Sequence, residues 1–324
     1  MTTLYLDQND LEIRADGQVL TMYRGGERCG CVPIKLLERV VIRGGQIRLD
    51  SGVLMKLAEA GVTTVLISPR IGRRVTIVLG PAHNDAAVRL AQARRVLDPE
   101  YCATFARGLI NAKLRRQQRT LQAAMTQRPD ARKPLFDALH ALERATETLS
   151  APALETASIR GIEGAAARAY FQGYTAIFLP ALAFTGRNRR PPRDPVNACL
   201  SLAYTMLHVD AVRAAHCAGL DPLLGFYHRP AIGRESLASD LVEPLRPAAD
   251  AWVCEMWRTR VFREDQFSVA AGACLLGKAG RARFYQEWEA QTLRHRRWLR
   301  KITTKIAHAL REEGAPWLAD EDFP

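Results

Sequence analysis

The sequence predicts a multidomain α and β fold, with a small β-rich domain over residues 1–84 and a larger all-α domain over residues 85–324. In the first part, apolar and polar residues alternate with a period of two between Gly-marked turns, which is typical of strands. In the second part, apolar residues recur at helical spacing, and Ala, Leu, Arg and Gln dominate. We expect the linker at residues 80–95, beginning with Gly80 and Pro81.

The β-rich part is expected to contain short strands and one helix. Residues 4–24 alternate, and Asp16 and Gly17 in their middle predict a hairpin turn. The helix follows, with Ser51 as the expected N-cap and Gly61 as the residue that ends it. Further strands are expected at residues 40–42, 47–49, 62–67 and 75–79.

The second part is expected to consist of consecutive helices separated by Pro or Gly. Asn84 or Asp85 can cap a helix that runs to Leu97. Pro99, directly after Asp98, is typical of the first turn of the next helix. Helices are then expected at residues 100–125, 134–149, 156–179, 195–218, 236–260 and 282–312.

Positive charge points to a polyanionic partner. The chain has 46 Lys and Arg against 34 Asp and Glu, a formal net charge of +12. Basic residues concentrate at residues 107–133, 187–193 and 294–305, all in the helical part. Any one of these stretches could be a solvated helix face, but three together favour binding to the backbone of a nucleic acid.

Membrane and disulfide classes are not supported. The longest apolar stretch, residues 173–186, is shorter than the roughly 20 residues of a spanning helix and contains Pro180. Asp7 and Asp10 stand where a signal peptide would carry basic residues, so we expect a cytoplasmic protein without a membrane partner. The seven cysteines are scattered, so we expect neither disulfides nor zinc.

One carboxylate lies on an apolar helix face. Glu163 interrupts the apolar positions of its predicted helix and is flanked by Gly161 and Gly164. Such a carboxylate is costly unless it is paired or bound to a metal ion. The glycines weaken the helix but let a ligand or another backbone approach closely. The alternative is an ion pair with Arg160 or Arg168.

A second group of polar residues lies further along the chain. His228 is in a loop rich in Pro and Gly, where an incidental surface histidine is the alternative to a functional one. Asp240 and Glu243 are three residues apart and share one helix side, so they repel unless a positive group lies between them. Arg246 or a metal ion could supply that charge. Pro244 predicts a kink or an early helix end.

Glutamate, histidine and one or two further carboxylates would make a hard, mostly oxygen metal site. Such a site suits Mn²⁺ or Mg²⁺ better than zinc, which prefers more His or Cys. An ion of this kind polarises a phosphoryl oxygen and activates water or a sugar hydroxyl for in-line attack. Together with the basic stretches, the acidic residues predict chemistry on phosphodiesters.

Three long motifs carry a resemblance to a known family. They are RGIEGAAARAYF at residues 160–171, RRPPRDPVNACLSLAYTML at residues 189–207 and the segment 228–246. RLAQAR at residues 89–94 and AKLRRQ at residues 112–117 accompany them. With these motifs the sequence resembles the CRISPR-associated adaptation integrases, which are metal-dependent DNA endonucleases.

The resemblance implies the roles of the acidic residues. Glu163, His228 and Glu243 would bind Mn²⁺ or Mg²⁺, and Asp240 would complete the catalytic set. Glu243 stands where some family members have Asp, and either carboxylate can bind the ion. The expected nucleic-acid contacts, from the motifs and the last basic stretch, are Tyr170, Arg189, Arg190, Asn197, Arg246, Arg297 and Lys301. Tyr170 could equally be a core aromatic residue.

The resemblance also implies a reaction and partners. Family members insert short duplex DNA into the CRISPR array, where a 3′-hydroxyl attacks a phosphodiester at the repeat boundary. The expected partners are double-stranded DNA (prespacer and CRISPR repeat), a second copy joined through the β-rich domain, and a smaller adaptation protein of ferredoxin-like fold that bridges two dimers. The helical domain would carry catalysis. The alternatives are a non-catalytic DNA-binding scaffold and a general DNA-repair or junction nuclease.

Overall fold

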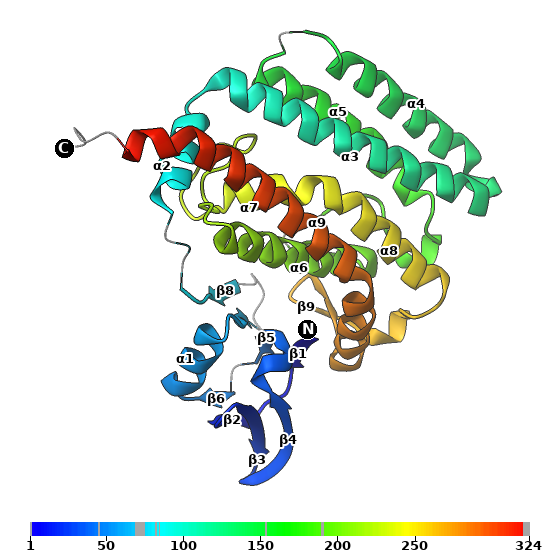
Figure 1. Ribbon diagram of the computed structural model, residues 1–324. Coiled ribbons are helices and arrows are strands. Elements are labelled where there is room, and N and C mark those ends of the chain that lie inside the picture. Colours follow the sequence, from blue (N-terminus) through cyan, green and yellow to red (C-terminus); the bar gives the residue numbers. More distant parts are fainter. Residues whose placement is uncertain are drawn as a thin grey trace. The chain divides into compact units, whose positions relative to one another are not determined.

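The computed structural model describes residues 2–44, 46–68, 75–81, 83, 85–152, 154–188 and 191–319. The chain forms two compact units, Met1–His83 with Arg281–Ala290, and Asn84–Gly280 with Gln291–Pro324 (Figure 1). A β-rich region therefore precedes a helical region, which confirms the predicted fold class at this level. A segment of the last helix belongs to the β-rich unit, which the sequence analysis did not predict.

Among its described residues, the first unit contains two four-stranded sheets. The first sheet has the spatial order β1 (Thr2–Leu6), β5 (Leu37–Arg43), β7 (Thr63–Ile67) and β8 (Val75–Val78). In it β1, β5 and β7 are parallel, and β8 is antiparallel to β7. The second sheet has the spatial order β4 (Glu27–Pro33), β3 (Val19–Arg24), β2 (Leu11–Asp16) and β6 (Arg48–Leu49). In it β2 pairs with β3 as the hairpin predicted at Asp16 and Gly17.

The helix of the first unit, α1 (Ser51–Glu59), begins differently from the prediction. Asp50 is the N-cap, and its carboxylate accepts the backbone N–H of Val53 at 2.8 Å. Ser51 is the first helical residue instead, because the neighbouring aspartate satisfies the free N–H groups. Gly61 follows the helix with a φ of +69°, as expected of a residue that ends it.

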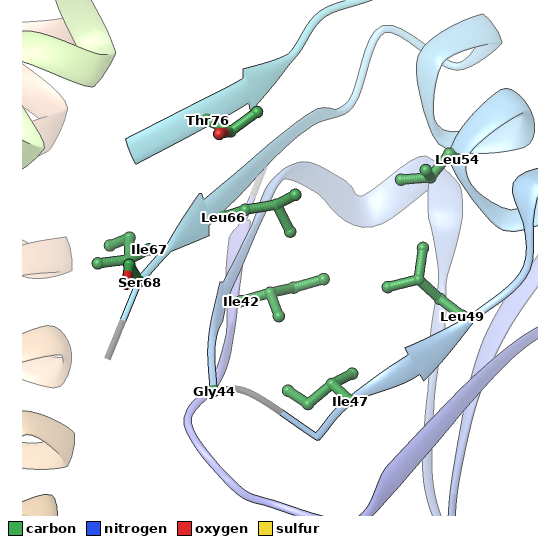
Figure 2. Close-up of a pocket in the computed structure, with 9 residues that line it drawn as sticks. All are labelled: Ile42, Gly44, Ile47, Leu49, Leu54, Leu66, Ile67, Ser68 and Thr76. Atoms are coloured by element: carbon green, nitrogen blue, oxygen red, sulfur yellow. The ribbon is translucent and has the colours of Figure 1, made fainter. Parts of the chain in front are cut away.

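An apolar pocket lies in the first unit. Figure 2 shows Ile42, Ile47, Leu49 and Leu66 directed toward a common space. The polar lining residues are Ser68 and Thr76, and no lining residue carries a titratable side chain. The pocket therefore offers no acid, base or metal ligand for catalysis.

The second unit is mainly helical. Its helices are α2 (Ala86–Val96), α3 (Pro99–Gln127), α4 (Arg132–Leu149), α5 (Thr156–Thr175), α6 (Pro195–Cys217), α7 (Ser236–Val242), α8 (Arg246–Arg258) and α9 (Lys278–Leu318). Residues 281–290 of α9 belong to the first unit. Asp85 caps α2, and Asp98 caps α3 with Pro99 in its first turn, as the sequence predicts. No helix in the described part of the chain is long and apolar enough to span a membrane.

Two expectations about the helical region are wrong. The helix expected at residues 236–260 is two helices, α7 and α8, separated by the 3₁₀ turn η4 (Glu243–Leu245). Pro244 in that turn explains the break, because proline cannot donate the helical hydrogen bond.

The region is also not all-α, because β9 (Phe267–Ala270) and β10 (Ala273–Leu276) form a hairpin. Their strands are short, and β9 is mostly exposed, so alternation is a weak signal there.

Helices α3, α4 and α5 pack against one another and position the candidate site (Figure 1). Gly173 on α5 permits this close packing, since a Cβ there would lie 2.6 Å from the Cβ of Ala138 on α4. The buried residues of these helices include Leu114, Leu121 and Leu142. Removing such a side chain costs about 2–5 kcal/mol in a packed core, so the backbones that carry the site are firmly held.

Candidate active site

Two of the three expected metal ligands converge on one lysine. The ammonium of Lys113 on α3 lies 2.5 Å from Oε1 of Glu163 on α5 and 2.6 Å from Oε2 of Glu243 on η4. The Lys113 and Glu243 side chains are 8% exposed, and that of Glu163 is 22% exposed. The structure thus brings together two carboxylates from distant parts of the sequence around a single cation.

Glu163 does not pair with the neighbours that the sequence offered as an alternative. Arg160 instead donates to the backbone carbonyl of Tyr227 at 2.7 Å, and Arg168 is exposed. The flanking residues Gly161 and Gly164 have nothing within 4 Å of an added Cβ. They therefore leave open space beside Glu163 rather than contact with another helix.

Lys113 was not expected at the site, since by sequence it belongs to the basic stretch 107–133. The spacing of its neighbours in the sequence nonetheless indicates that Lys113 points inward. On α3 the buried residues Ile110, Leu114 and Gln117 surround Lys113 at helical spacing, so the lysine lies on the inward face. A lysine on such a face almost always has an acidic partner, and this one has two.

The electrostatics of the site favour the charged forms of Glu243 and Lys113. Burial by itself raises the pKa of Glu243, but the charges of Arg246 and Lys113 outweigh burial and bring its pKa well below the usual value. Burial likewise lowers the pKa of Lys113, yet the two glutamates outweigh that effect and its pKa rises. Arg246 completes the arrangement, with its Nε 3.0 Å from Oε1 of Glu243.

The third acidic residue, Asp240, positions the histidine. Its fully buried carboxylate accepts the backbone N–H groups of Phe226, Tyr227 and His228 at 2.8–3.0 Å. It also lies 2.6 Å from Nδ1 of His228. A carboxylate at that distance favours the tautomer with the proton on Nδ1, which leaves the Nε2 lone pair for a ligand. Asp240 therefore acts on His228 and has no oxygen left for a metal ion.

Gly225 allows the His228 loop to fold back onto α7. A Cβ at this position would lie 2.6 Å from the carbonyl carbon of Ser236 and 2.7 Å from the carbonyl oxygen of His228. Both contacts are with backbone atoms, which cannot move aside cheaply. Only glycine therefore fits here, and the close approach places the imidazole against Asp240.

Two residues expected to contact nucleic acid are buried. Tyr170 is 0% exposed, and its hydroxyl donates to Oδ2 of Asp250 at 2.9 Å. It is therefore a core aromatic residue, which was the alternative to a nucleic-acid contact. Asn197 is also 0% exposed. Its amide donates to Asp194 and to the carbonyl of Gly186, and its oxygen accepts from Arg187, so it shapes the loop before α6. Neither side chain can reach a nucleic acid in this structure.

The other expected contacts differ in their positions. Arg246 is 22% exposed and is engaged by Glu243 and by the ring of Tyr204. Arg297 and Lys301 are exposed on α9. Arg189 and Arg190 lie outside the described residues.

Asp250 on α8 is a buried carboxyl that the sequence did not single out. It accepts from the hydroxyl groups of Tyr170 and Tyr204, and its carbonyl accepts from Tyr174 at 2.8 Å. Burial raises its pKa to about 6. These bonds join α5 and α6 to α8, the helix that follows Glu243 in the chain.

No group of three His, Cys, Asp or Glu side chains close enough to hold a metal ion occurs in the described part of the chain. Instead, two cations engage Glu243. Lys113 engages one of its carboxylate oxygens and Arg246 engages the other. The described site is therefore one in which ammonium and guanidinium groups neutralise the carboxylates.

The comparisons with known proteins show the family. Residues 4–290 match the family model described as CRISPR associated protein Cas1. The CRISPR-associated endonuclease Cas1 1 of Thermodesulfovibrio yellowstonii is 36% identical over 324 residues, covering 97% of this chain and 98% of the relative.

Two solved structures share the fold. A casposase bound to integration product has a TM-score of 0.83 and 21% identity, covering 97% of this chain and 91% of that chain. A Cas6-RT-Cas1–Cas2 complex has a TM-score of 0.82 and 22% identity, covering 96% of this chain and 35% of that chain. On the family match and the full-length relative, this chain belongs to the Cas1 family of CRISPR-associated proteins.

Proposed function

We propose that this protein is a metal-dependent DNA endonuclease and integrase of CRISPR adaptation, which inserts short duplex DNA into the CRISPR array. The observation that carries the proposal is the convergence of Glu163 and Glu243 on one cation. The full-length relative named as an endonuclease supports a nuclease activity.

The residues present fit a divalent ion. The Lys113 ammonium is a stand-in for it, because it is a cation already held by both carboxylates. Glu163, Glu243 and Nε2 of His228 would hold Mn²⁺ or Mg²⁺, a donor set of oxygens and one imidazole. When bound, the ion would polarise a phosphoryl oxygen and promote ionisation of an attacking hydroxyl.

The protein's own residues would orient the reaction. Asp240 holds the imidazole of His228 in one orientation, and Arg246 holds the carboxylate of Glu243. In the proposed step the 3′-oxygen of the incoming DNA forms a bond to phosphorus. The bond from phosphorus to the 3′-oxygen of the target strand breaks, and that oxygen takes up a proton as the new 3′-hydroxyl. One phosphodiester replaces another, so the reaction needs no external energy source.

A basic stripe on α9 would hold the DNA backbone. Arg294, Arg297, Lys301 and Lys305 follow one another at spacings of three and four and are all exposed. The opposite side of the helix is buried at Leu299 and Thr303. Lysine and arginine contacts to phosphate give affinity without base specificity and depend strongly on salt.

The proposed partners extend this function. The β-rich domain, residues 1–84, would join two copies, and the helical domain, residues 85–324, would carry catalysis. A smaller adaptation protein of ferredoxin-like fold would bridge two such dimers. The neighbour solved as a Cas6-RT-Cas1–Cas2 complex supports a second CRISPR protein as partner.

An integration assay tests the proposal. It combines a short DNA duplex, a supercoiled plasmid with a CRISPR repeat and Mn²⁺, and compares the wild type with Glu163→Gln. We expect joined products from the wild type and a loss of at least about 10²-fold in the variant. Binding without cutting or joining under any divalent ion would favour the scaffold. Cutting of branched DNA without joining would favour a repair nuclease.

A further inference from the structure

Lys113 occupies the position between Glu163 and Glu243 that the proposed metal ion would take. Its ammonium is within 2.6 Å of both Glu163 and Glu243. We propose that Lys113 is an internal counter-ion that must leave the carboxylates when the divalent ion binds, so that metal loading is an exchange of cations. This inference rests on the proposed function, because it assumes the metal site described above.

The charges at the site support an exchange. Two carboxylates, Glu163 and Glu243, are already balanced by one ammonium and one guanidinium, Lys113 and Arg246. Adding a divalent ion without releasing a cation would leave two positive charges in excess in a largely buried space. Unbalanced charge is costly away from water. The carboxylates also lack room, since Lys113 and Arg246 engage the two oxygens of Glu243.

Lys113 is the cation better suited to leave. Its ammonium is a point charge at the end of a flexible four-carbon stem. Arg246 has a second contact, because its guanidinium lies 4.7 Å from the centroid of the Tyr204 ring. Movement of the lysine therefore disturbs fewer contacts than movement of the arginine.

Contacts other than those of Lys113 also hold the surrounding structure. Arg116, one turn further along α3, donates to the carbonyl of Pro244 at 2.6 Å and ties α3 to η4. Tyr170 and Tyr174 tie α5 to Asp250 on α8. These contacts hold the backbones of Glu163 and Glu243 in place after the ammonium has moved, so the ligands stay assembled.

Direct measurement of Mn²⁺ binding tests the exchange. The full-length protein without DNA is titrated with Mn²⁺, and free Mn²⁺ is measured by electron paramagnetic resonance. Lys113→Met removes the competing cation, and Lys113→Gln removes its charge but keeps hydrogen-bond donors. We expect both variants to bind Mn²⁺ with a dissociation constant lowered by about tenfold or more, since a competing state reduces apparent affinity. Lys133→Met, an exposed lysine paired with Asp137, is the control for net charge and should bind like the wild type.

The thermal midpoint is a second readout, which applies if Lys113→Met folds less stably than the wild type. Without metal, Lys113→Met leaves the carboxylates facing each other, so its thermal midpoint should be below that of the wild type. Saturating Mn²⁺ should raise the midpoint of the variant more than that of the wild type, because binding stabilises the native state. Equal shifts in the two proteins would contradict the exchange.

The outcomes separate this inference from the proposed function. Mn²⁺ binding by the wild type that Glu163→Gln abolishes, together with unchanged or weaker binding by Lys113→Met and Lys113→Gln, would overturn the exchange alone. Mn²⁺ binding that is absent from all variants, or that does not respond to Glu163→Gln, would overturn the metal site itself. Tighter binding in both Lys113 variants with an unchanged Lys133→Met supports the exchange.

Discussion

The carboxylate of Asp240 lies 2.6 Å from Nδ1 of His228 and accepts the backbone N–H of the same residue at 2.8 Å. A single buried side chain thus fixes both the backbone and the ring of the histidine. Asp240 and His228 are separated by 12 positions, and α7 brings them together. The imidazole is oriented before any metal ion or substrate arrives, which reduces the cost of binding.

Asp240→Asn should weaken metal binding without removing a ligand. The amide cannot accept from all four donors, and it no longer favours the proton on Nδ1 of His228. We expect the dissociation constant for Mn²⁺ to rise by about 10–100-fold and the thermal midpoint to fall. Asp137→Asn, an exposed aspartate on α4, serves as the control. Unchanged Mn²⁺ binding in Asp240→Asn would show that the carboxylate does not orient the ring.

Tyr170→Phe should change stability and leave DNA binding intact. The variant removes the hydroxyl that donates to buried Asp250, which should cost about 1–2 kcal/mol of unfolding free energy. The affinity for duplex DNA should stay the same, because the side chain is fully buried. Denaturant unfolding and a fluorescence binding titration check the two effects. Tyr23→Phe, which removes an exposed hydroxyl, should alter neither.

Arg297 and Lys301 should matter for DNA binding and not for folding. Both side chains are exposed, so Arg297→Ala with Lys301→Ala should change stability by no more than about 0.5 kcal/mol. If both contact phosphates, the slope of log affinity against log salt should become less steep by about 2. Binding titrations at several salt concentrations measure that slope. A slope equal to that of the wild type would exclude this face of α9 from the DNA interface.

The contribution of Asp250 to the free energy of unfolding should decrease as the pH rises. Burial raises its pKa to about 6 from the ordinary 3.8, so the folded state binds the proton more tightly than the unfolded state. Its contribution to stability is therefore complete below about pH 4 and is lost as the pH rises through about 6. The total change is up to about 3 kcal/mol.

Asp250→Asn cannot lose this proton and isolates the effect. Relative to the wild type, the variant should gain stability steadily between pH 4 and pH 7, as measured by urea unfolding at intervals of about half a pH unit. A stability difference that stays constant over this range would contradict the raised pKa of Asp250.

Gly161→Ala should stabilise the protein. Nothing lies within 4 Å of an added Cβ, and the residue is in the interior of α5, where alanine is favoured over glycine by about 1 kcal/mol. A higher thermal midpoint with weaker DNA cleavage would indicate that the open space beside Glu163 admits substrate. A lower midpoint would contradict the absence of neighbours.

Local features of the fold follow from the sequence because they depend on near neighbours. Asp98 followed by Pro99 predicts the start of α3, and Pro244 predicts the break between α7 and α8. The hairpin at Asp16 and Gly17 is predicted for the same reason. The cap of α1 was misassigned by one residue, because Asp50 and Ser51 are both good caps and only the backbone geometry chooses between them.

By itself the sequence determined the family motifs, the β-rich start and most helix limits, and it marked Glu163, His228, Asp240 and Glu243 as candidate site residues. The tertiary structure decided which charged and polar groups are internal. Lys113 meets partners 50 and 130 positions away, Asp250 meets tyrosines from α5 and α6, and Tyr170 and Asn197 are buried. The reason is physical: caps and periodicity act within a few residues, whereas burial and the partners of a charge are set by elements that only the folded chain brings together.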